Sequence, residues 1–331
     1  MLRLIYQAIL GRVVEEINAG LLVDSFREPD LNRMYIQAVS GGRRSRALLV
    51  LAGCEAVGGR RRAAMPMALA MELAHKASLI VDDVVDRDLL RRGRPTFHAR
   101  YGPRQAVVMS DILMSLAYQQ LTKFDRSDES HVVAECYRLL SDTYHTMCLG
   151  EIQELLLDEG GMSEDNTLAV AHKKSGLMIE NCLRAGGMLG RGQEAEIAAL
   201  GEFGRSIGLA FQLINDLNSV KDIEGHTGRP VGNDLRIGRM NFLAAHALRR
   251  ANAADRSRLG QLLAADELET TQVQESIELL HRSGAVRAAE EQIRALLEEA
   301  RKSLGPLRLS IIKTLFLKVI DHAGDPWLWT S

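Results

Sequence analysis

Apolar side chains recur every three or four positions over most of this chain. The windows at residues 48–52, 67–74, 112–117 and 207–214 show this spacing clearly, which places apolar residues on one face of a helix. The two-residue alternation that is typical of a half-buried strand is absent from the sequence. Glycines and prolines interrupt the pattern at residues 41–42, 58–59, 93–95, 102–103, 160–161, 225–230 and 324–326. The pattern therefore predicts an all-α fold built from roughly ten or more helices.

Composition supports this fold class and bounds the number of domains. Hydrophobic residues make up 46% of the 331 positions and charged residues 25%, which is ordinary for a globular protein with a large core. The chain contains seven prolines. None lies between Pro103 and Pro230, so long helices can run through that stretch. None of the breaks has the composition of a linker, and we expect a single helical domain over residues 1–331.

Charge and cysteine usage exclude some classes of partner. The formal net charge is −2 and the basic residues are spread along the chain, so no nucleic-acid-binding surface is expected. No apolar run is long enough to cross a bilayer, and we expect no transmembrane segment. Zinc-site spacing is missing among the four cysteines, which favours reduced thiols in the core of a cytoplasmic protein. They are Cys54, Cys136, Cys148 and Cys182.

Three aspartates interrupt an apolar helical stretch. Asp82, Asp83 and Asp86 lie in the sequence LIVDDVVD of residues 79–86, and Asp82 and Asp86 share one face because they are four residues apart. Their mutual repulsion would be costly unless a cation lay between them. Carboxylates that share Mg²⁺ with substrate phosphates are one such arrangement. The alternative is a solvated helix end at which these aspartates pair with nearby arginines.

Two groups of arginines accompany the aspartates. Arg91 and Arg92 follow them before a Gly-Arg-Pro stop, so their guanidinium groups can fold back toward whatever the carboxylates hold. A second group, with Arg43 and Arg46, follows the glycine pair at residues 41–42 and opens a predicted helix, and helix N-termini favour anions. Carboxylates, a metal ion and arginines around one anion indicate phosphate chemistry.

These motifs resemble those of the trans-isoprenyl diphosphate synthases, over residues 41–243 of the chain. The family signature GGKR-x-RP is similar to GGRRSRA at residues 41–47, and the family's DDxxD motif with a following RRG is similar to residues 82–86 and 91–93. The family's K-T, F-Q and GKPxGxDL elements are similar to residues 174–175, 211–212 and 228–235.

The resemblance implies a helical bundle of the isoprenoid synthase type around a central cavity, usually as a homodimer. It also implies a reaction in which Mg²⁺, three ions in the family, helps an allylic prenyl diphosphate to ionise, after which isopentenyl diphosphate attacks the allylic cation. Such chemistry needs both Lewis acidity and the exclusion of water.

The resemblance further implies a role for each matching residue. Metal ligands would be Asp82, Asp83 and Asp86 of the first motif and Asn215, Asp216 and Ser219 of the second. The allylic diphosphate would contact Arg91, Lys174 and Arg229, and isopentenyl diphosphate would contact Arg43, Arg46, His75 and Arg92. Near the developing cation would lie Ser175 and Gln212, and a further substrate-binding lysine of the family is here Arg239. The expected catalytic set is Asp82, Asp83, Asp86, Lys174 and Gln212.

The second metal motif departs from the family pattern FQxxDDxxD. Residues 211–219 read FQLINDLNS, so Asn215 and Ser219 replace two of its three aspartates. Gln212, Asn215, Asp216 and Ser219 still lie on one helical face. Because the motif loses two negative charges, we expect the third metal ion to be held weakly.

Two other functions stay open from the sequence. Asn215 and Ser219 also resemble the metal motif of class I terpene synthases, with Asp222 or Glu224 in place of its last ligand, which favours a lyase that acts on a single prenyl diphosphate. The other alternative is a non-catalytic partner subunit of an active synthase. The basic residues assigned to isopentenyl diphosphate argue against the lyase, and the complete first motif argues against the subunit.

Product length follows from small residues before the first motif. In the family, bulky residues four and five positions before the first aspartate stop the product early, and here these positions are Ser78 and Ala77. We therefore expect an all-trans product of C20 or longer. Candidate floors of the tunnel are Met71, Leu73, Met114 and Tyr118.

Overall fold

The computed structural model describes residues 2–22, 26–91, 93–124, 130–156, 163–221, 232–236, 240–265 and 268–323, with side chains throughout except at residues 2–10, 233 and 234. Within these ranges the chain is almost entirely helical, which confirms the all-α prediction. The α-helices are Leu2–Leu22 (α1), Pro29–Val39 (α2), Ser45–Ala56 (α3), Arg61–Val85 (α4), Phe97–Tyr101 (α5), Pro103–Leu121 (α6), Ser130–Leu156 (α7), Glu164–Ala171 (α8), Leu177–Leu189 (α9), Glu194–Val220 (α10), Asn233–Arg236 (α11), Phe242–Arg250 (α12), Ala253–Leu263 (α13), Thr270–Arg282 (α14), Ala285–Ser303 (α15) and Ile311–Asp321 (α16). One π-helical turn, η1 (His172–Gly176), joins α8 to α9, and a two-stranded hairpin of β1 (Leu90–Arg91) and β2 (Arg94–Pro95) follows α4.

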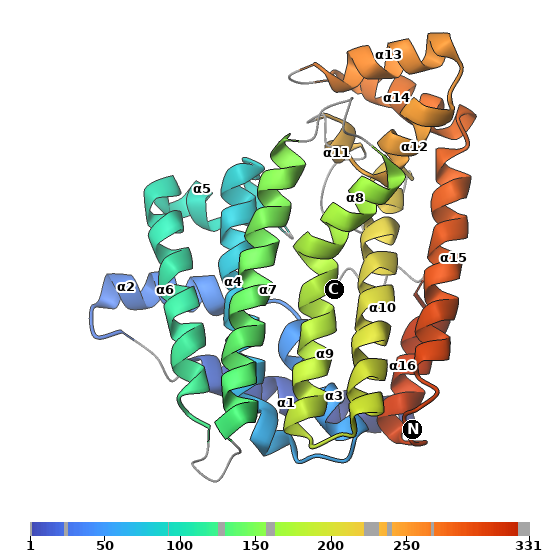
Figure 1. Ribbon diagram of the computed structural model, residues 1–331. Coiled ribbons are helices and arrows are strands. Elements are labelled where there is room, and N and C mark those ends of the chain that lie inside the picture. Colours follow the sequence, from blue (N-terminus) through green and yellow to red (C-terminus); the bar gives the residue numbers. More distant parts are fainter. Residues whose placement is uncertain are drawn as a thin grey trace.

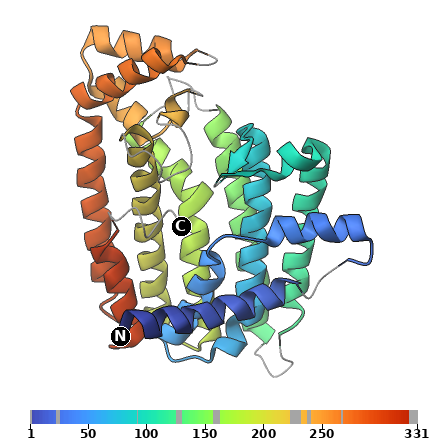
Figure 2. The same ribbon diagram turned by 180° about the vertical axis from the view of Figure 1, so that it is seen from behind.

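The long helices form a bundle. In Figure 1, α4, α6, α7, α9, α10 and α15 run side by side, and Figure 2 shows α1 lying across one end of them. Within the bundle α4 packs against α3 and α6, α9 packs against α3 and α10, and α10 packs against α15. The small helices α13 and α14 lie at the opposite end from α1. The helices that carry the two aspartate motifs, α4 and α10, are therefore both central to the bundle.

Local sequence signals set where the long helices begin. At the start of α6, Pro103 follows Gly102, whose φ of 94° favours glycine, and proline suits a first helical turn because its missing N–H has no partner there. A capping box opens α10, with the backbone N–H of Gln193 donating to Oε2 of Glu196 at 2.9 Å. Since no proline interrupts them, α7 and α10 each extend over 27 residues.

Among the described residues, buried apolar side chains form three clusters. The first joins α1, α3, α4, α6 and α7, the second joins α10 with α12 to α15, and the third lies between α3, α9, α10, α15 and α16.

Three of the four thiols, Cys54, Cys136 and Cys182, are buried and free, whereas Cys148 is exposed, so the prediction that all four lie in the core is wrong for Cys148. Burial raises the pKa of Cys54 to about 11 and that of Cys182 to about 12, which keeps both protonated.

In the part of the chain that the structure describes, two core helices have the length and composition of a membrane span. These are α4 and α10, but 72% and 61% of their most apolar windows are buried inside the protein. A central helix of a globular protein passes the same test, because it is apolar on most sides. The two helices are therefore weak evidence for a membrane segment.

Glycines allow α3 and α9 to approach closely. A Cβ added at Gly186 would lie 2.1 Å from the carbonyl oxygen of Val50 and 2.8 Å from the backbone nitrogen of Cys54. On the other helix, a Cβ added at Gly53 would lie 2.5 Å from the carbonyl oxygen of Leu183. The neighbouring atoms are all backbone, so neither contact can be relieved by a change of rotamer.

We expect Gly186→Ala to lower the free energy of unfolding by about 1–3 kcal/mol, because the added methyl group forces α3 and α9 apart. Urea titration followed by circular dichroism measures the loss. The matched control is Gly11→Ala in α1, where an added Cβ meets nothing within 4 Å, and where alanine stabilises a helix relative to glycine. Equal unfolding midpoints for the two variants would contradict the close packing of α3 on α9.

Candidate active site

A cavity of about 1140 Å³ opens between α3, α4, α9, α10 and α16. It brings together both predicted metal motifs and the two groups of basic residues, which are far apart in the sequence. Twelve of the predicted site residues line it, namely Arg43, Arg46, His75, Asp82, Asp86, Arg91, Lys174, Ser175, Gln212, Asn215, Asp216 and Ser219. Three others, Arg92, Arg229 and Arg239, lie outside the described residues, as do Asp222 and Glu224.

The first aspartate motif lies at the C-terminal end of α4. Asp86 is the C-cap residue, and its backbone N–H donates to the carbonyl oxygen of Asp82 at 2.8 Å. Asp82 and Asp86, one turn apart, both line the cavity, whereas Asp83 is only 5% exposed and does not line it. The motif therefore presents two of its three carboxylates to the cavity.

Electrostatics at Asp82 indicate a site that accepts a cation. Burial raises the pKa of this carboxyl group to about 7, with Glu151 and Asp86 adding to the increase and Lys174 and Arg91 opposing it. A carboxylate that is costly to ionise alone is favoured once a cation neutralises it. Among the described residues no group of three or more His, Cys, Asp or Glu side chains is arranged to hold a metal ion. The donor set fits a hard divalent ion that takes part of its ligands from a diphosphate and water.

Arg91 is held against the first motif by the hairpin that follows α4. Its Nε donates to Oδ1 of Asp83 at 2.6 Å, and its Nη2 lies 4.0 Å from Oδ2 of Asp88. The hairpin is fixed in turn by Thr96, whose hydroxyl donates to the carbonyl oxygen of Asp88 at 2.7 Å. Asp83 therefore holds Arg91 at the cavity wall, and the sequence did not distinguish Asp83 from its two neighbours.

The glycine and arginine loop before α3 wraps over α4. Gly41 and Gly42 have φ values of 68° and 83°, which glycine adopts without strain. Lys76, buried at 8% exposure, donates to the carbonyl oxygens of Ser40 at 3.1 Å and of Gly41 at 2.8 Å. These bonds fix the loop, so that Arg43 and Arg46 line the cavity.

Arg44 differs from the arginines beside it. It is 5% exposed and lies 3.7 Å from Glu72, whose other oxygen accepts from the backbone N–H of Ala47 at 3.3 Å. Its Nε donates to Oδ1 of Asn18 on α1 at 2.6 Å. Arg44 is thus a buried tie between α1, α3 and α4.

Lys174 lies between two carboxylates that the sequence analysis did not single out. Its Nζ is 2.6 Å from Oε2 of Glu151 and also pairs with Glu154, both on α7. Burial by itself lowers the pKa of Lys174, but these two carboxylates outweigh it and leave the pKa raised. Lys174 is consequently a fixed positive charge in the cavity wall.

The second motif forms a chain of polar contacts along α10. The hydroxyl of Ser175 donates to Oε1 of Gln212 at 3.3 Å, and Nε2 of Gln212 donates to Oδ1 of Asp216 at 2.9 Å. Ser219 donates its hydroxyl to the carbonyl oxygen of Asp216 at 2.7 Å. Asp216 is therefore the one carboxylate that this motif supplies to the cavity, which Asp82 and Asp86 of the first motif also line.

The rest of the cavity lining is largely apolar. It includes Leu48, Met178, Ile207, Phe211 and Phe316, among others, and also the ion pair of Glu55 and Arg61. Ser78 also lines the cavity, whereas Ala77 is fully buried and does not. Four residues were expected to close the tunnel, and none of them is among the described residues that line the cavity. They are Met71, Leu73, Met114 and Tyr118.

The chain is similar in sequence to proteins of a known family. The profile of the polyprenyl synthetase family matches residues 28–280. A short chain isoprenyl diphosphate synthase of Methanothermobacter thermautotrophicus is 35% identical over 278 residues, which cover 80% of this chain and 84% of that protein.

Solved structures share the fold over almost the whole chain. The crystal structure of a geranylgeranyl pyrophosphate synthetase from Pyrococcus horikoshii superposes with a TM-score of 0.86 at 27% identity, covering 97% of this chain and 99% of that one. A geranylgeranyl pyrophosphate synthase from Corynebacterium glutamicum, complexed with isoprenyl diphosphate and magnesium, has a TM-score of 0.83 at 21% identity, covering 96% and 98%.

Proposed function

This chain belongs to the polyprenyl synthetase family and is a trans-isoprenyl diphosphate synthase, and we propose that it condenses an allylic prenyl diphosphate with isopentenyl diphosphate to give an all-trans product of C20 or longer. The observation that carries the proposal is the cavity itself. The carboxylates of both motifs and the basic residues line it together with many apolar side chains, which suits a substrate with a diphosphate head and a hydrocarbon tail.

We propose Mg²⁺ as the resident metal, held by Asp82 and Asp86 on one side of the cavity and more weakly by Asn215, Asp216 and Ser219 on the other. The total of three ions is part of this proposal. When bound, Mg²⁺ would neutralise the diphosphate and act as a Lewis acid that favours departure of the diphosphate from the allylic carbon.

The chain's own residues bind the substrates and shield the reaction. Lys174 and Arg91 supply positive charge beside the carboxylates for the allylic diphosphate, and Arg43, Arg46 and His75, which also line the cavity, suit isopentenyl diphosphate. The amide of Gln212 and the hydroxyl of Ser175 place neutral oxygens near the developing cation, where neither can act as a strong nucleophile. The apolar wall excludes water, which would otherwise capture the cation.

The assembly and location of the enzyme are further proposals. A homodimer agrees with the exposed apolar residues Val107 and Val108 on α6, which are 53% and 58% exposed and would be covered by a second copy. Light scattering that gives the mass of one chain would contradict the dimer. A cytoplasmic location agrees with the free thiols, and fractionation of cells that produce the tagged protein tests it.

Product analysis tests the proposed function directly. Purified protein is incubated with Mg²⁺ and farnesyl diphosphate, with and without radiolabelled isopentenyl diphosphate, and with EDTA as the metal-free control. We expect label in a C20 or longer diphosphate that disappears with EDTA. Unlabelled hydrocarbon or alcohol in both incubations would indicate the lyase, and no product from any allylic primer would indicate a non-catalytic subunit.

We expect Ser78→Phe to shorten the main product by at least one five-carbon unit, because the phenyl ring would fill part of the cavity that Ser78 lines. Chromatography of the dephosphorylated products measures the chain length. The matched control is Ala77→Phe, since Ala77 is buried beside the cavity and its carbonyl oxygen accepts from Ser110 at 3.2 Å. That variant is expected to lose stability through overpacking. Unchanged product length in a folded Ser78→Phe variant would contradict the assignment of the growing prenyl chain to the part of the cavity beside Ser78.

A further inference from the structure

The helix that carries Lys174 and Ser175 contains an irregular turn. Helices α8 and α9 are joined without a break by the π-helical turn His172–Gly176, and both residues belong to it. A π turn inserts one extra residue into an α-helix; such turns are rare and frequently lie at functional sites. Some interaction in the surrounding structure must therefore favour this turn over a regular helix.

A polar contact spans the turn from end to end. Nε2 of His172 and Oε2 of Glu180 are 3.0 Å apart, and the two side chains are 20% and 17% exposed. At 3.6 residues per turn, positions eight apart in a regular α-helix point about 80° apart. The extra residue of the π turn removes about 100° of this rotation, which leaves the two positions only about 20° apart. The contact between His172 and Glu180 is thus favoured by the π turn and opposed by a regular helix.

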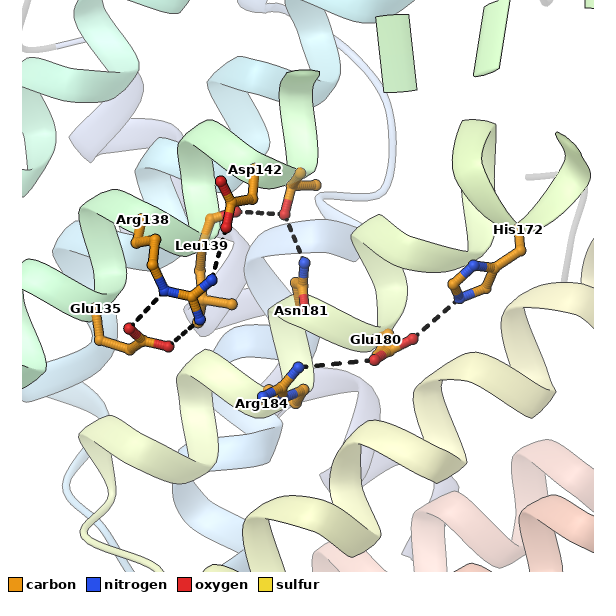
Figure 3. A network of polar contacts seen from close by, with 9 residues as sticks. Glu135, Arg138, Leu139, Asp142, His172, Glu180, Asn181 and Arg184 are labelled. Carbon is orange, nitrogen blue, oxygen red and sulfur yellow. Dashed lines mark hydrogen bonds and ion pairs between the residues drawn. The ribbon is translucent and has the colours of Figure 1, made fainter. Parts of the chain in front are cut away.

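The far end of this contact is fixed to the rest of the bundle. Oε1 of Glu180 lies 3.8 Å from Nη1 of Arg184, and Figure 3 shows His172, Glu180 and Arg184 following one another along the helix. The next residue, Asn181, is 3% exposed and donates to the hydroxyl of Thr143 on α7 at 2.8 Å. Glu180 therefore belongs to the rigid part of α9, and it restrains His172 from there.

The turn that these residues hold is packed tightly on both sides. A Cβ at Gly150 of α7 would lie 3.1 Å from the backbone nitrogen of Lys174, and a Cβ at Gly208 of α10 would lie 2.8 Å from the Cα of Gly176. Lys174 contacts Glu151 on α7 and Ser175 contacts Gln212 on α10. A change in the turn would therefore disturb contacts with α7 and α10 together.

We propose that His172 and Glu180 are positioning residues, which hold the π turn so that Lys174 and Ser175 meet the allylic diphosphate. Neither His172 nor Glu180 lines the cavity, so their effect on the reaction passes through the turn. The proposal rests on the function proposed above, because it assigns the turn to the allylic substrate.

The test compares His172→Ala, Glu180→Ala, the double variant and Glu180→Gln. We expect both alanine variants to raise the KM for the allylic diphosphate and to lower kcat, each on the order of 10-fold, because small displacements of a binding group are costly. The KM for isopentenyl diphosphate, which is assigned to Arg43, Arg46 and His75, should change less than about twofold. The double variant should be no worse than either single variant, and Glu180→Gln should recover part of the loss, because its amide can still bond to the histidine.

A matched control lies on α7. Arg138→Ala removes the contacts of Arg138 with Glu135 and Asp142, which Figure 3 shows beside the network of His172, but none of these three residues lines the cavity. It should leave both KM values unchanged. Equal changes of the two KM values in His172→Ala, or lower stability without any change of KM, would overturn the positioning role.

A binding measurement separates this inference from the proposed function. Calorimetric titration with inorganic diphosphate and Mg²⁺ should show an affinity on the order of 10-fold weaker for His172→Ala than for the wild-type protein. Wild-type protein that binds diphosphate but forms no condensation product would count against the proposed function alone. Equal diphosphate affinity in both proteins would overturn the positioning role alone.

Discussion

Asp82→Ala is expected to lower turnover by about 10³-fold or more, since the loss of several kcal/mol of transition-state stabilisation has this effect. Asp82 lines the cavity one helical turn from Asp86, and burial together with Glu151 raises its pKa to about 7. These features describe a carboxyl group whose ionised form a bound cation would favour. The alanine variant removes a ligand of the proposed metal and leaves Asp86 as the only carboxylate that the first aspartate motif presents to the cavity.

Steady-state turnover at saturating Mg²⁺ and both substrates measures the effect. The matched control is Asp142→Ala on α7, whose carboxylate pairs with Arg138 at 2.6 Å on the surface and is 55% exposed. This control should retain wild-type turnover and the wild-type circular dichroism spectrum. Near-normal turnover of a folded Asp82→Ala variant would remove Asp82 from the metal site.

Helical periodicity was sufficient to predict most of the fold. Residue type alone, however, could not predict which aspartates of the first motif line the cavity. The four-residue spacing predicted a common face for Asp82 and Asp86, and both line the cavity. Asp83 has the same side chain, but its direction depends on the hairpin that returns Arg91 to it. The contact between Arg91 and Asp83 depends on how the hairpin folds back on α4, which no local pattern in the sequence predicts.

The contacts of Lys174 are a second feature that the sequence could not predict. Glu151 and Glu154 lie on another helix, at least twenty residues before Lys174 in the sequence, and glutamates at helical spacing are usually exposed. The π turn is equally hidden, because residues 163–189 continue in helical character with one residue inserted. A shift in the apolar register on the two sides of residues 172–176 is the signal that could have revealed it.

The arginines near the start of α3 have different roles because they differ in burial. The sequence offered Arg43 and Arg46 as substrate-binding residues and gave no distinct role to Arg44. In the structure Arg44 adopts a left-handed backbone conformation with φ of 59° and points into the protein toward Glu72. Both partners are nearly inaccessible, with 5% and 2% of their side chains exposed. The loop that presents the two outer arginines is therefore anchored by the middle one.

Glu72→Ala is expected to lower the free energy of unfolding by about 3–5 kcal/mol, the usual cost of leaving one member of a buried ion pair without its partner. Burial already lowers the pKa of Arg44, and Glu72 opposes that decrease, so the guanidinium group loses its counter-charge in this variant. The backbone N–H of Ala47, at the start of α3, also loses its acceptor. Denaturant titration measures the change in stability.

Two comparisons isolate the cause. Glu275→Ala breaks an exposed pair with Arg258, in which both side chains are about 40% exposed, and it should change stability far less because water screens such pairs. The double variant with both Arg44 and Glu72 replaced by methionine should recover much of the loss, since an apolar pair leaves no buried charge. If Glu72→Ala were as stable as Glu275→Ala, the buried pair would not anchor the loop. If it is destabilised as expected, the KM for isopentenyl diphosphate should also rise, because Arg43 and Arg46 depend on the same loop for their positions.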